Sequence, residues 1–409
     1  MAFPESDDLL VFLLVVAARL LVPLAIPRWP LPAILAALLL DAVDQTVFQR
    51  FTVLNLTGYQ GYDKALDVYY LAIAYLSTFR NWADPEAFAI GRFLFYVRLV
   101  GVALFEVTGW RPLLLLFPNT FEYFFIFFEA VRLRWNPRRL TERQLLATAA
   151  AIWIVVKLPQ EYWIHIARLD TTDLIKQRVF GVPIETGWDE IVANNAAAFI
   201  GFGLALALLV AAVRWFVRTK LPPADWSRSF DPDARGRDVT EAQVGTAELA
   251  RARRLFDREL VEKVALVSLV TVVFSQILPG VRASNVQLAV GVAVVIVANT
   301  ALTEAMARSA LDWSSLVLQF AAMAVVNLGI VVAFALLLVP LRFVDAGINL
   351  GNTLFFALLL TLLVILYDRY QPVHAARLAA ARDAAARAEH VAASRAVAAD
   401  GGARAGGGD

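Results

Sequence analysis

The amino-acid sequence predicts an all-α, polytopic integral membrane protein with about eleven transmembrane helices. The chain is 59% hydrophobic and only 18% charged, whereas soluble domains average roughly 45–50% apolar and about 25% charged residues. The apolar residues fall into repeated runs of about 20 residues, the length that crosses about 30 Å of hydrocarbon. These runs do not alternate between apolar and polar residues, so they do not fit the strands of an outer-membrane barrel.

The spans can be placed in chain order from these apolar runs. Acidic residues precede the first run, where a signal peptide would carry positive charge, so this run is predicted to be a retained first span. The predicted spans cover residues 9–26, 31–48, 63–80, 88–107, 111–131, 144–166, 191–217, 259–278, 285–306, 313–339 and 348–367.

The distribution of basic residues predicts the orientation. Arginine and lysine clusters follow the fifth, seventh and eleventh spans, at residues 132–143, 214–220 and 369–387. The positive-inside rule places all three clusters in the cytoplasm. Eleven spans satisfy this rule when the N-terminus is outside and the C-terminus is cytoplasmic. We therefore predict a multi-pass protein of the plasma (inner) membrane.

Composition divides the chain into four parts. Residues 1–217 are predicted to form a charged, aromatic-rich membrane domain of about seven spans that carries the candidate site. Residues 218–258 form a basic cytoplasmic loop with a helix, which is too small to be a catalytic domain. Residues 259–367 form an apolar membrane domain of about four spans. Residues 368–409 are predicted to form a cytoplasmic Ala/Arg-rich helix and a disordered Gly-rich tail.

Four aspartates at the second and third spans form the main candidate site. Asp41 and Asp44 are spaced i,i+3, and Asp63 and Asp67 are spaced i,i+4, so each pair shares one helix face. If the two helices form a hairpin, the four carboxylates converge at the outer membrane surface. Four clustered carboxylates cannot all remain ionised without compensation by a cation or by protons.

Three interpretations of this acidic cluster remain open. The carboxylates could be solvated helix ends neutralised by Lys64 and Arg50, although Asp41 directly follows an apolar run. They could instead hold a divalent cation, and oxygen ligands alone favour Mg²⁺, Mn²⁺ or Ca²⁺ over zinc. They could also bind protons or another cation. The candidate metal ligands are Asp41, Asp44, Asp63 and Asp67, of which Asp41 and Asp44 are also candidate catalytic residues.

The spacing D-x-x-D at 41–44 followed by D-x-x-x-D at 63–67 resembles the paired-aspartate signature of the CDP-alcohol phosphotransferases. In that family the aspartates hold two metal ions. This sequence has Gln45 where the signature has glycine, and its second aspartate pair is displaced by one residue. No residue role is therefore transferred from the family.

Spans four and five carry charges at matching depths. In an antiparallel hairpin that turns near Gly109, Arg92 faces Glu129 and Arg98 faces Glu122. An unpaired charge at mid-bilayer costs roughly 2.5–3.5 kcal/mol. The pattern therefore predicts an ion-pair ladder that fixes the register of the hairpin. A proton or ion relay through Arg98 and Glu122 is the alternative.

Three polar residues of the sixth span share one helix face, because Lys157, Glu161 and His165 follow at i, i+4 and i+8. A base, an acid and an imidazole near the outer surface are suited to acid–base chemistry. The alternative is an interfacial histidine beside a snorkelling lysine. Glu161 and His165 are candidate catalytic residues. The candidate substrate-binding residues are Arg98, Glu122, Lys157 and Arg168.

Three functions are compatible with this pattern. The first is a membrane-embedded transferase or hydrolase that acts on a lipid-linked (polyprenyl- or phospholipid) substrate at the extracytoplasmic face, with a divalent cation as its only expected cofactor. The second is a proton- or cation-coupled secondary transporter of a small solute, and the third is a non-catalytic membrane scaffold. Membrane lipids are the expected partners, and no nucleic acid is expected. Enzymatic activity and oligomeric state are left open.

Overall fold

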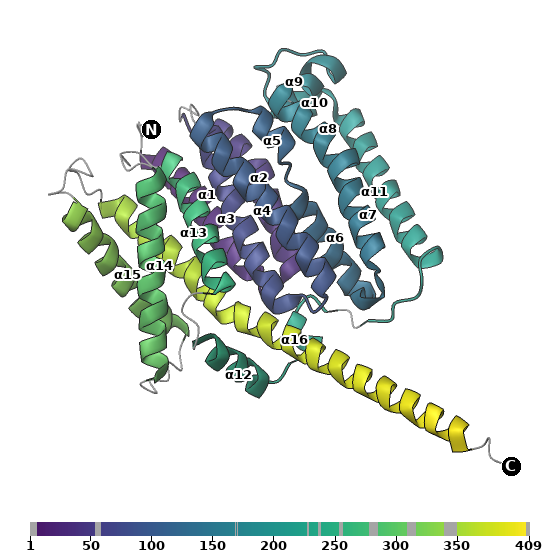
Figure 1. The fold of residues 1–409 in the computed structure, drawn as a ribbon. Helices are drawn as coiled ribbons and strands as arrows, with labels where there is room; N and C mark the ends of the chain where they lie inside the picture. The colour runs from purple at the N-terminus through teal and green to yellow at the C-terminus, as the bar shows by residue number, and fades with distance from the viewer. Residues whose placement is uncertain are drawn as a thin grey trace.

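The computed structural model of the chain describes most residues, and their regular structure is entirely helical, as the sequence predicts (Figure 1). Each of the eleven predicted spans overlaps at least one helix. Within the described residues, six helices are long and apolar enough to cross a membrane, namely Asp7–Ala25, Pro30–Phe51, Pro85–Thr108, Pro112–Arg134, Ala196–Thr219 and Leu354–Ala384. The described residues are 6–53, 59–167, 169, 171–226, 229–235, 239–252, 257–277, 285–308, 316–338 and 350–405.

Helix α3 (Tyr59–Asn81) lies at the centre of the bundle (Figure 1). Every residue from 65 to 79 is buried. Its neighbours are α1 (Ser6–Leu21), α2 (Pro30–Phe51), α4 (Pro85–Thr108), α6 (Thr120–Arg134), α13 (Arg258–Ile277) and α16 (Leu350–Ala405). Because α3 contacts protein over most of its surface, it can carry charged residues that a lipid-facing helix could not. This explains why α3 is not among these six helices although it lies inside the bundle.

The turn at Gly109 joins α4 to the next span, as the sequence predicts. Gly109 ends α4 in the left-handed conformation, with φ of 68°. The span that follows is interrupted, because α5 (Pro112–Leu116) ends before Phe117 and α6 begins at Thr120. Pro118 lies in this break, where its missing N–H disrupts no helical hydrogen bond.

The predicted sixth span is helical but irregular. Its elements are α7 (Glu142–Ala151), η3 (Ile152–Lys157), α8 (Leu158–Glu161) and η4 (Tyr162–Ile166). Both η3 and η4 are π-helical, a conformation that is rare and is found frequently at functional sites. The chain continues through α9 (Thr171–Leu174), η5 (Ile175–Val179), α10 (Trp188–Asn194) and α11 (Ala196–Thr219).

Gly101 of α4 permits a close approach to the break between α5 and α6. A Cβ atom at position 101 would lie 2.1 Å from the Cβ atom of Phe117. We expect Gly101→Ala to reduce the free energy of unfolding by about 1–3 kcal/mol, because the break would have to shift. Gly203→Ala in α11 is the matched control, since no described atom lies within 4 Å of that added Cβ. Equal melting temperatures for the two variants would contradict this role of Gly101.

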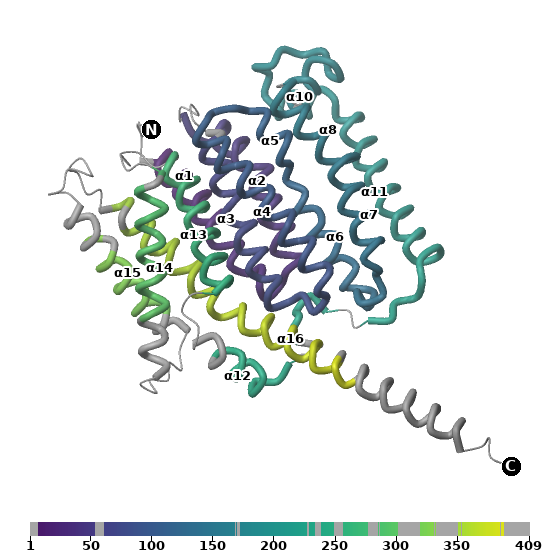
Figure 2. Tube along the Cα trace, viewed as in Figure 1, coloured from purple at the N-terminus to yellow at the C-terminus, as the bar shows by residue number. Residues whose placement is uncertain are grey.

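The second half of the chain packs beside the first bundle. It contains α12 (Glu241–Ala252), α13, α14 (Asn285–Arg308), α15 (Leu316–Leu338) and α16. Figure 2 shows α13–α15 on one side of the N-terminal helices and α7, α8 and α11 on the other. A buried hydrogen-bond chain links the last three helices, because Asn299 donates to Asn327, which donates to Thr361 at 2.8 Å. These polar residues therefore have a structural role.

Helix α16 joins the predicted eleventh span and the predicted cytoplasmic helix into one element of 56 residues. It extends past the bundle (Figure 1). The helix continues to Ala405, beyond the predicted start of the disordered Gly-rich tail, because an Ala-rich sequence propagates a helix that is already nucleated. Residues 406–409 lie outside the described residues.

Candidate functional site

The four predicted aspartates converge inside the bundle around an arginine that sequence reasoning missed. Arg19 of α1 is only 3% exposed. Its guanidinium lies 2.5 Å from a carboxylate oxygen of Asp41, 3.4 Å from Asp63 and 3.3 Å from Asp67, and it also pairs with Asp44. Helices α2 and α3 each present one aspartate pair on one face, as their spacing predicts. The only sequence signal for Arg19 was a lone arginine in an otherwise apolar first span.

Lys64 is the second cation of the acidic cluster. Its Nζ atom lies 2.8 Å from Asp63 and 3.2 Å from Asp67. Arg50 does not join them, because it forms an exposed ion pair with Asp189. The side chains of Asp44 and Asp67 are 1% and 7% exposed. The predicted neutralisation by Arg50 is therefore wrong, whereas that by Lys64 is confirmed. The cluster is not a set of solvated helix ends, because Asp44 and Asp67 are buried and Asp41 and Asp63 are only 25% and 19% exposed.

The acidic cluster contains more negative than positive charge. Four carboxylates surround two basic side chains, Arg19 and Lys64, so full ionisation leaves an excess of two negative charges. Uncompensated charge is costly in a low-dielectric interior, because desolvation is not repaid by an opposite charge. Protons or a bound cation would remove this excess.

Three of the four aspartates could share one metal ion. Oxygen atoms of Asp41, Asp63 and Asp67 lie within 4.8 Å of one another. Asp44, the fourth predicted ligand, is not part of this group; its carboxylate pairs with Arg19. The oxygen donors suit a hard divalent ion such as Mg²⁺ or Ca²⁺. The Arg19 guanidinium contacts the same carboxylates, so its positive charge would repel a metal ion bound there.

A second buried cluster forms where α6 meets the irregular sixth span. The Glu122 carboxylate accepts hydrogen bonds from the Tyr70 hydroxyl at 2.7 Å and the Asn119 amide at 2.9 Å. Lys157 lies 3.5 Å from the same carboxylate, and its Nζ atom stands 3.7 Å from the centre of the Tyr123 ring. Glu122 and Lys157 are both 3% exposed, so this ion pair is fully enclosed.

Glu161 is the other acidic residue of the second cluster. Its carboxylate lies 3.0 Å from His165 Nε2 and 3.7 Å from the Arg98 guanidinium. It also accepts a hydrogen bond from the backbone N–H of Asn119 at 3.2 Å. Lys157, Glu161 and His165 lie together in this cluster, as their spacing predicts. They are buried, however, and not exposed at an outer surface.

The predicted ion-pair ladder between the fourth and fifth spans is wrong. Arg98 pairs with Glu161 rather than with Glu122, and it donates to the Phe117 carbonyl at 3.3 Å. Arg92 lies 3.6 Å from Glu262 of α13. The predicted pairing assumed one straight helix after Gly109. The helix breaks before α6 instead, and the packing of α7–η4 supplies Glu161 as the partner of Arg98. Glu129 likewise pairs with Arg132 and accepts a hydrogen bond from the Trp82 indole.

Helix α3 connects the two clusters. Asp67 belongs to the acidic cluster, and Tyr70, which follows at i+3 on the same helix face, donates to Glu122 of the second cluster. Buried polar groups therefore continue from α1 and α2 through α3 to α6 and η4. A chain of this kind inside a bundle is expensive to build, and such chains commonly carry ions or protons.

The second cluster also contains buried polar atoms without a hydrogen-bond partner among the described residues. They are Arg98 Nε, Asn119 Oδ1 and His165 Nδ1. A buried polar atom left unsatisfied costs about 1–3 kcal/mol. These atoms are therefore suited to contact a bound solute or water. The remaining predicted substrate-binding residue, Arg168, lies outside the described residues.

Comparison with known proteins does not assign a function to the chain. No family model matches the chain, and neither a curated protein nor a solved structure matches it. The arrangement of the buried charges is therefore the basis on which a function can be argued.

Proposed function

We propose that the protein is a proton- or cation-coupled secondary transporter of the plasma membrane, and that the coupling cation binds at the acidic cluster. The observation that carries this proposal is the excess of two negative charges around Arg19 and Lys64. A cation or protons that enter the cluster would lower its electrostatic cost. Release of that positive charge would restore the repulsion among the carboxylates. Occupancy of the cluster would then alter how α1, α2 and α3 pack.

The second cluster is the proposed solute site. Transporter sites are commonly built at interrupted helices near the middle of the membrane. The break at Phe117–Asn119 and the π-helical segments η3 and η4 supply such irregular backbone. The polar atoms of Arg98, Asn119 and His165 that have no described partner would bind a small polar solute. Tyr70 would couple this site to the acidic cluster.

The proposal includes eleven spans, with the N-terminus outside and the C-terminus in the cytoplasm. This orientation is supported by the way basic segments from distant parts of the chain meet at one end of the bundle. Arg134 donates to the Val217 carbonyl at 3.2 Å, and Arg138 and Arg369 line one cavity. The positive-inside rule would place that end in the cytoplasm.

A metal-dependent transferase or hydrolase is the second candidate. The grouping of Asp41, Asp63 and Asp67 within 4.8 Å favours it, since a divalent ion could bind a lipid-linked phosphate there. In this candidate Asp41, Asp44, Glu161 and His165 would be catalytic. The separation of these residues into two clusters weakens the case, as does the position of the Arg19 guanidinium at the carboxylates that would hold the metal.

Charge displacement on a solid-supported membrane tests the transporter proposal. Proteoliposomes would be exposed to steps in pH, Na⁺, Mg²⁺ or Ca²⁺ concentration. We expect one of these steps to produce a transient current, because the cation enters a site inside the membrane. We expect Asp41→Asn to reduce this current by about tenfold, since it removes one of the two excess charges. Asp189→Asn, at an exposed ion pair, is the control and should behave as wild type.

The outcomes separate the candidates. Absence of any transient current in folded wild-type protein, or an unchanged current in folded Asp41→Asn, would refute the transporter proposal. Mg²⁺-dependent turnover of a polyprenyl phosphate or phospholipid in the same liposomes, lost in Asp41→Asn, would establish the transferase instead.

A further inference from the structure

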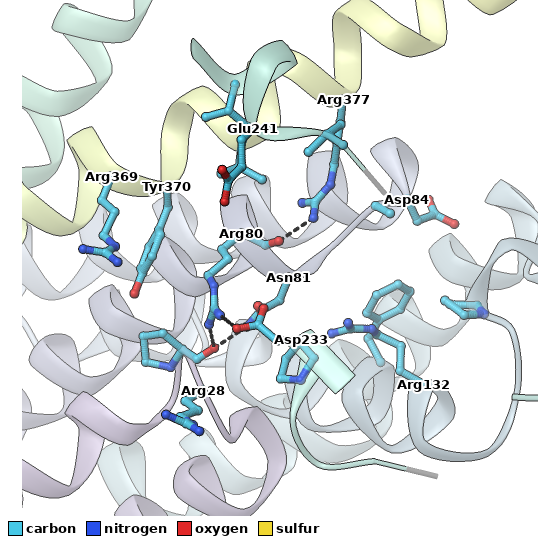
Figure 3. Close-up of a pocket in the computed structure, with 18 of the residues that line it drawn as sticks. Arg28, Arg80, Asn81, Asp84, Arg132, Asp233, Glu241, Arg369, Tyr370 and Arg377 are labelled. Carbon is cyan, nitrogen blue, oxygen red and sulfur yellow. Dashed lines mark hydrogen bonds and ion pairs between the residues drawn. The ribbon is translucent and has the colours of Figure 1, made fainter. Parts of the chain in front are cut away.

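A large cavity opens at the C-terminal end of α3 (Figure 3). The acidic cluster lies near the N-terminal end of that helix. Its volume is about 1020 Å³, at the upper end of the range of roughly 300–1,000 Å³ that is typical for small-molecule sites. The cavity therefore has room for more than a single inorganic anion. Neither the acidic cluster nor the second cluster lines it.

The wall that the helical bundle contributes to this cavity is strongly basic. It carries six arginines and a single acidic residue, Asp84. Asp84 is already engaged, because its carboxylate caps α4 by accepting from the N–H groups of Glu86 and Ala87. The arginines are Arg28, Arg80, Arg132, Arg138, Arg369 and Arg377.

Two of these arginines are held by structural contacts. Arg377 donates to the carbonyl oxygens of Phe79, Arg80 and Trp82 and so closes the C-terminal end of α3. Arg132 is paired with Glu129 at 2.7 Å. These two side chains therefore shape the cavity and add to its positive potential.

Arg138 and Arg369 are differently placed. Both line the cavity and are exposed, and within the described residues neither side chain forms an ion pair. Tyr370 lies beside Arg369 in the wall (Figure 3). Two uncommitted guanidinium groups in a basic cavity are well suited to an anion, because guanidinium binds phosphate through paired hydrogen bonds.

The cavity is covered by an acidic segment of the same chain. We define this cover segment as residues 225–226, 229–235 and 239–252, which include η6 (Pro232–Arg235) and α12. Asp233 pairs with Arg80 (Figure 3), and Asp231 lies 3.7 Å from Arg28. Carboxylates of the cover segment therefore occupy wall arginines in the position that an external anion would take.

We propose that this cavity binds a phosphate-bearing ligand, and that Asp231 and Asp233 occupy its arginines until the ligand displaces them. A phosphate group outcompetes a carboxylate because it carries up to two charges and three acceptor oxygens. Displacement would free the cover segment from Arg28 and Arg80. The proposal is independent of whether the protein transports a solute.

The phosphate can belong to a soluble molecule or to a lipid headgroup, and two arms of one experiment distinguish these sources. In the first arm, pyrophosphate is titrated into the full-length protein in phosphatidylcholine nanodiscs, and binding is measured by calorimetry. In the second, the melting temperature is compared between pure phosphatidylcholine nanodiscs and nanodiscs that also contain phosphatidic acid. Saturable binding in the first arm assigns a soluble ligand, and stabilisation in the second arm alone assigns a lipid.

Two sets of variants test the mechanism in both arms. Asp231→Asn with Asp233→Asn removes the internal competitor and should strengthen ligand binding by about tenfold, because the ligand no longer has to displace two ion pairs. Arg138→Gln with Arg369→Gln should weaken ligand binding by at least about tenfold, because the phosphate loses charge-assisted hydrogen bonds to two guanidinium groups. These variants break no ion pair in the described structure. Arg218→Gln with Lys220→Gln removes two charges outside the cavity and is the matched control.

The proposal fails on either of two results. One is the absence of both pyrophosphate binding and stabilisation by phosphatidic acid in wild-type protein and in the aspartate variant. The other is an equal effect of the Arg138/Arg369 variant and the Arg218/Lys220 control, which would assign any binding to the general charge of that end of the bundle.

Discussion

Replacement of Arg19 by glutamine is expected to destabilise the protein by about 3–5 kcal/mol, the cost of removing one partner from a buried ion pair. Arg19 is the group shared by all four aspartates. Without it, Lys64 is the one remaining basic side chain that the described residues place at the aspartates, and Asp44 loses its ion pair with Arg19. We expect a large loss of folded yield and a lower melting temperature in detergent.

A compensating substitution separates charge from packing in this prediction. Arg19→Gln combined with Asp44→Asn removes one positive and one negative charge and should recover much of the lost stability. Arg50→Gln is the control, because the ion pair of Arg50 with Asp189 is exposed and such pairs contribute about 0–1 kcal/mol. If Arg19→Gln melts at the same temperature as Arg50→Gln, the aspartates do not depend on Arg19.

Glu161→Gln should have a comparable effect at the second cluster, with an expected loss of about 3–5 kcal/mol. The substitution leaves Arg98, which is 3% exposed, without its acidic partner. It also weakens the contacts to His165 and to the Asn119 backbone. Denaturant unfolding in micelles measures this loss.

A matched variant distinguishes a charge effect from a general sensitivity of the irregular helix. Gln160 neighbours Glu161 in α8, and Gln160→Glu places a carboxylate one residue away without restoring the pairing. The double variant Gln160→Glu, Glu161→Gln should therefore remain destabilised. Recovery of wild-type stability in the double variant would show that the net charge matters and the specific contacts of Glu161 do not.

Local periodicity predicted those parts of the site that depend on a single helix. The i,i+3 and i,i+4 spacings correctly placed each aspartate pair on one face, and the spacing of Lys157, Glu161 and His165 correctly placed them together. Each of these relations is fixed by helix geometry alone. The contact between Glu161 and His165 at 3.0 Å is a direct consequence.

The relations that failed depend on packing between helices. Arg19 meets the aspartates only because α1 packs against α2 and α3, and no spacing within the sequence encodes that contact. The ladder of Arg98 and Glu122 failed because a break at Phe117–Asn119 changes the register of the following helix. The π-helical turns of the sixth span likewise arise from interactions that a regular helical period does not contain.

The enclosure of α3 has a consequence for biosynthesis. A helix that carries Asp63, Lys64 and Asp67 close to its start is unfavourable in lipid by itself, because unpaired charges are costly to remove from water and the cost rises with depth in the membrane. Arg19 and the aspartates of α2 emerge from the ribosome before α3 does. The first three helices are therefore expected to enter the bilayer together, with α3 shielded by its neighbours from the moment of insertion.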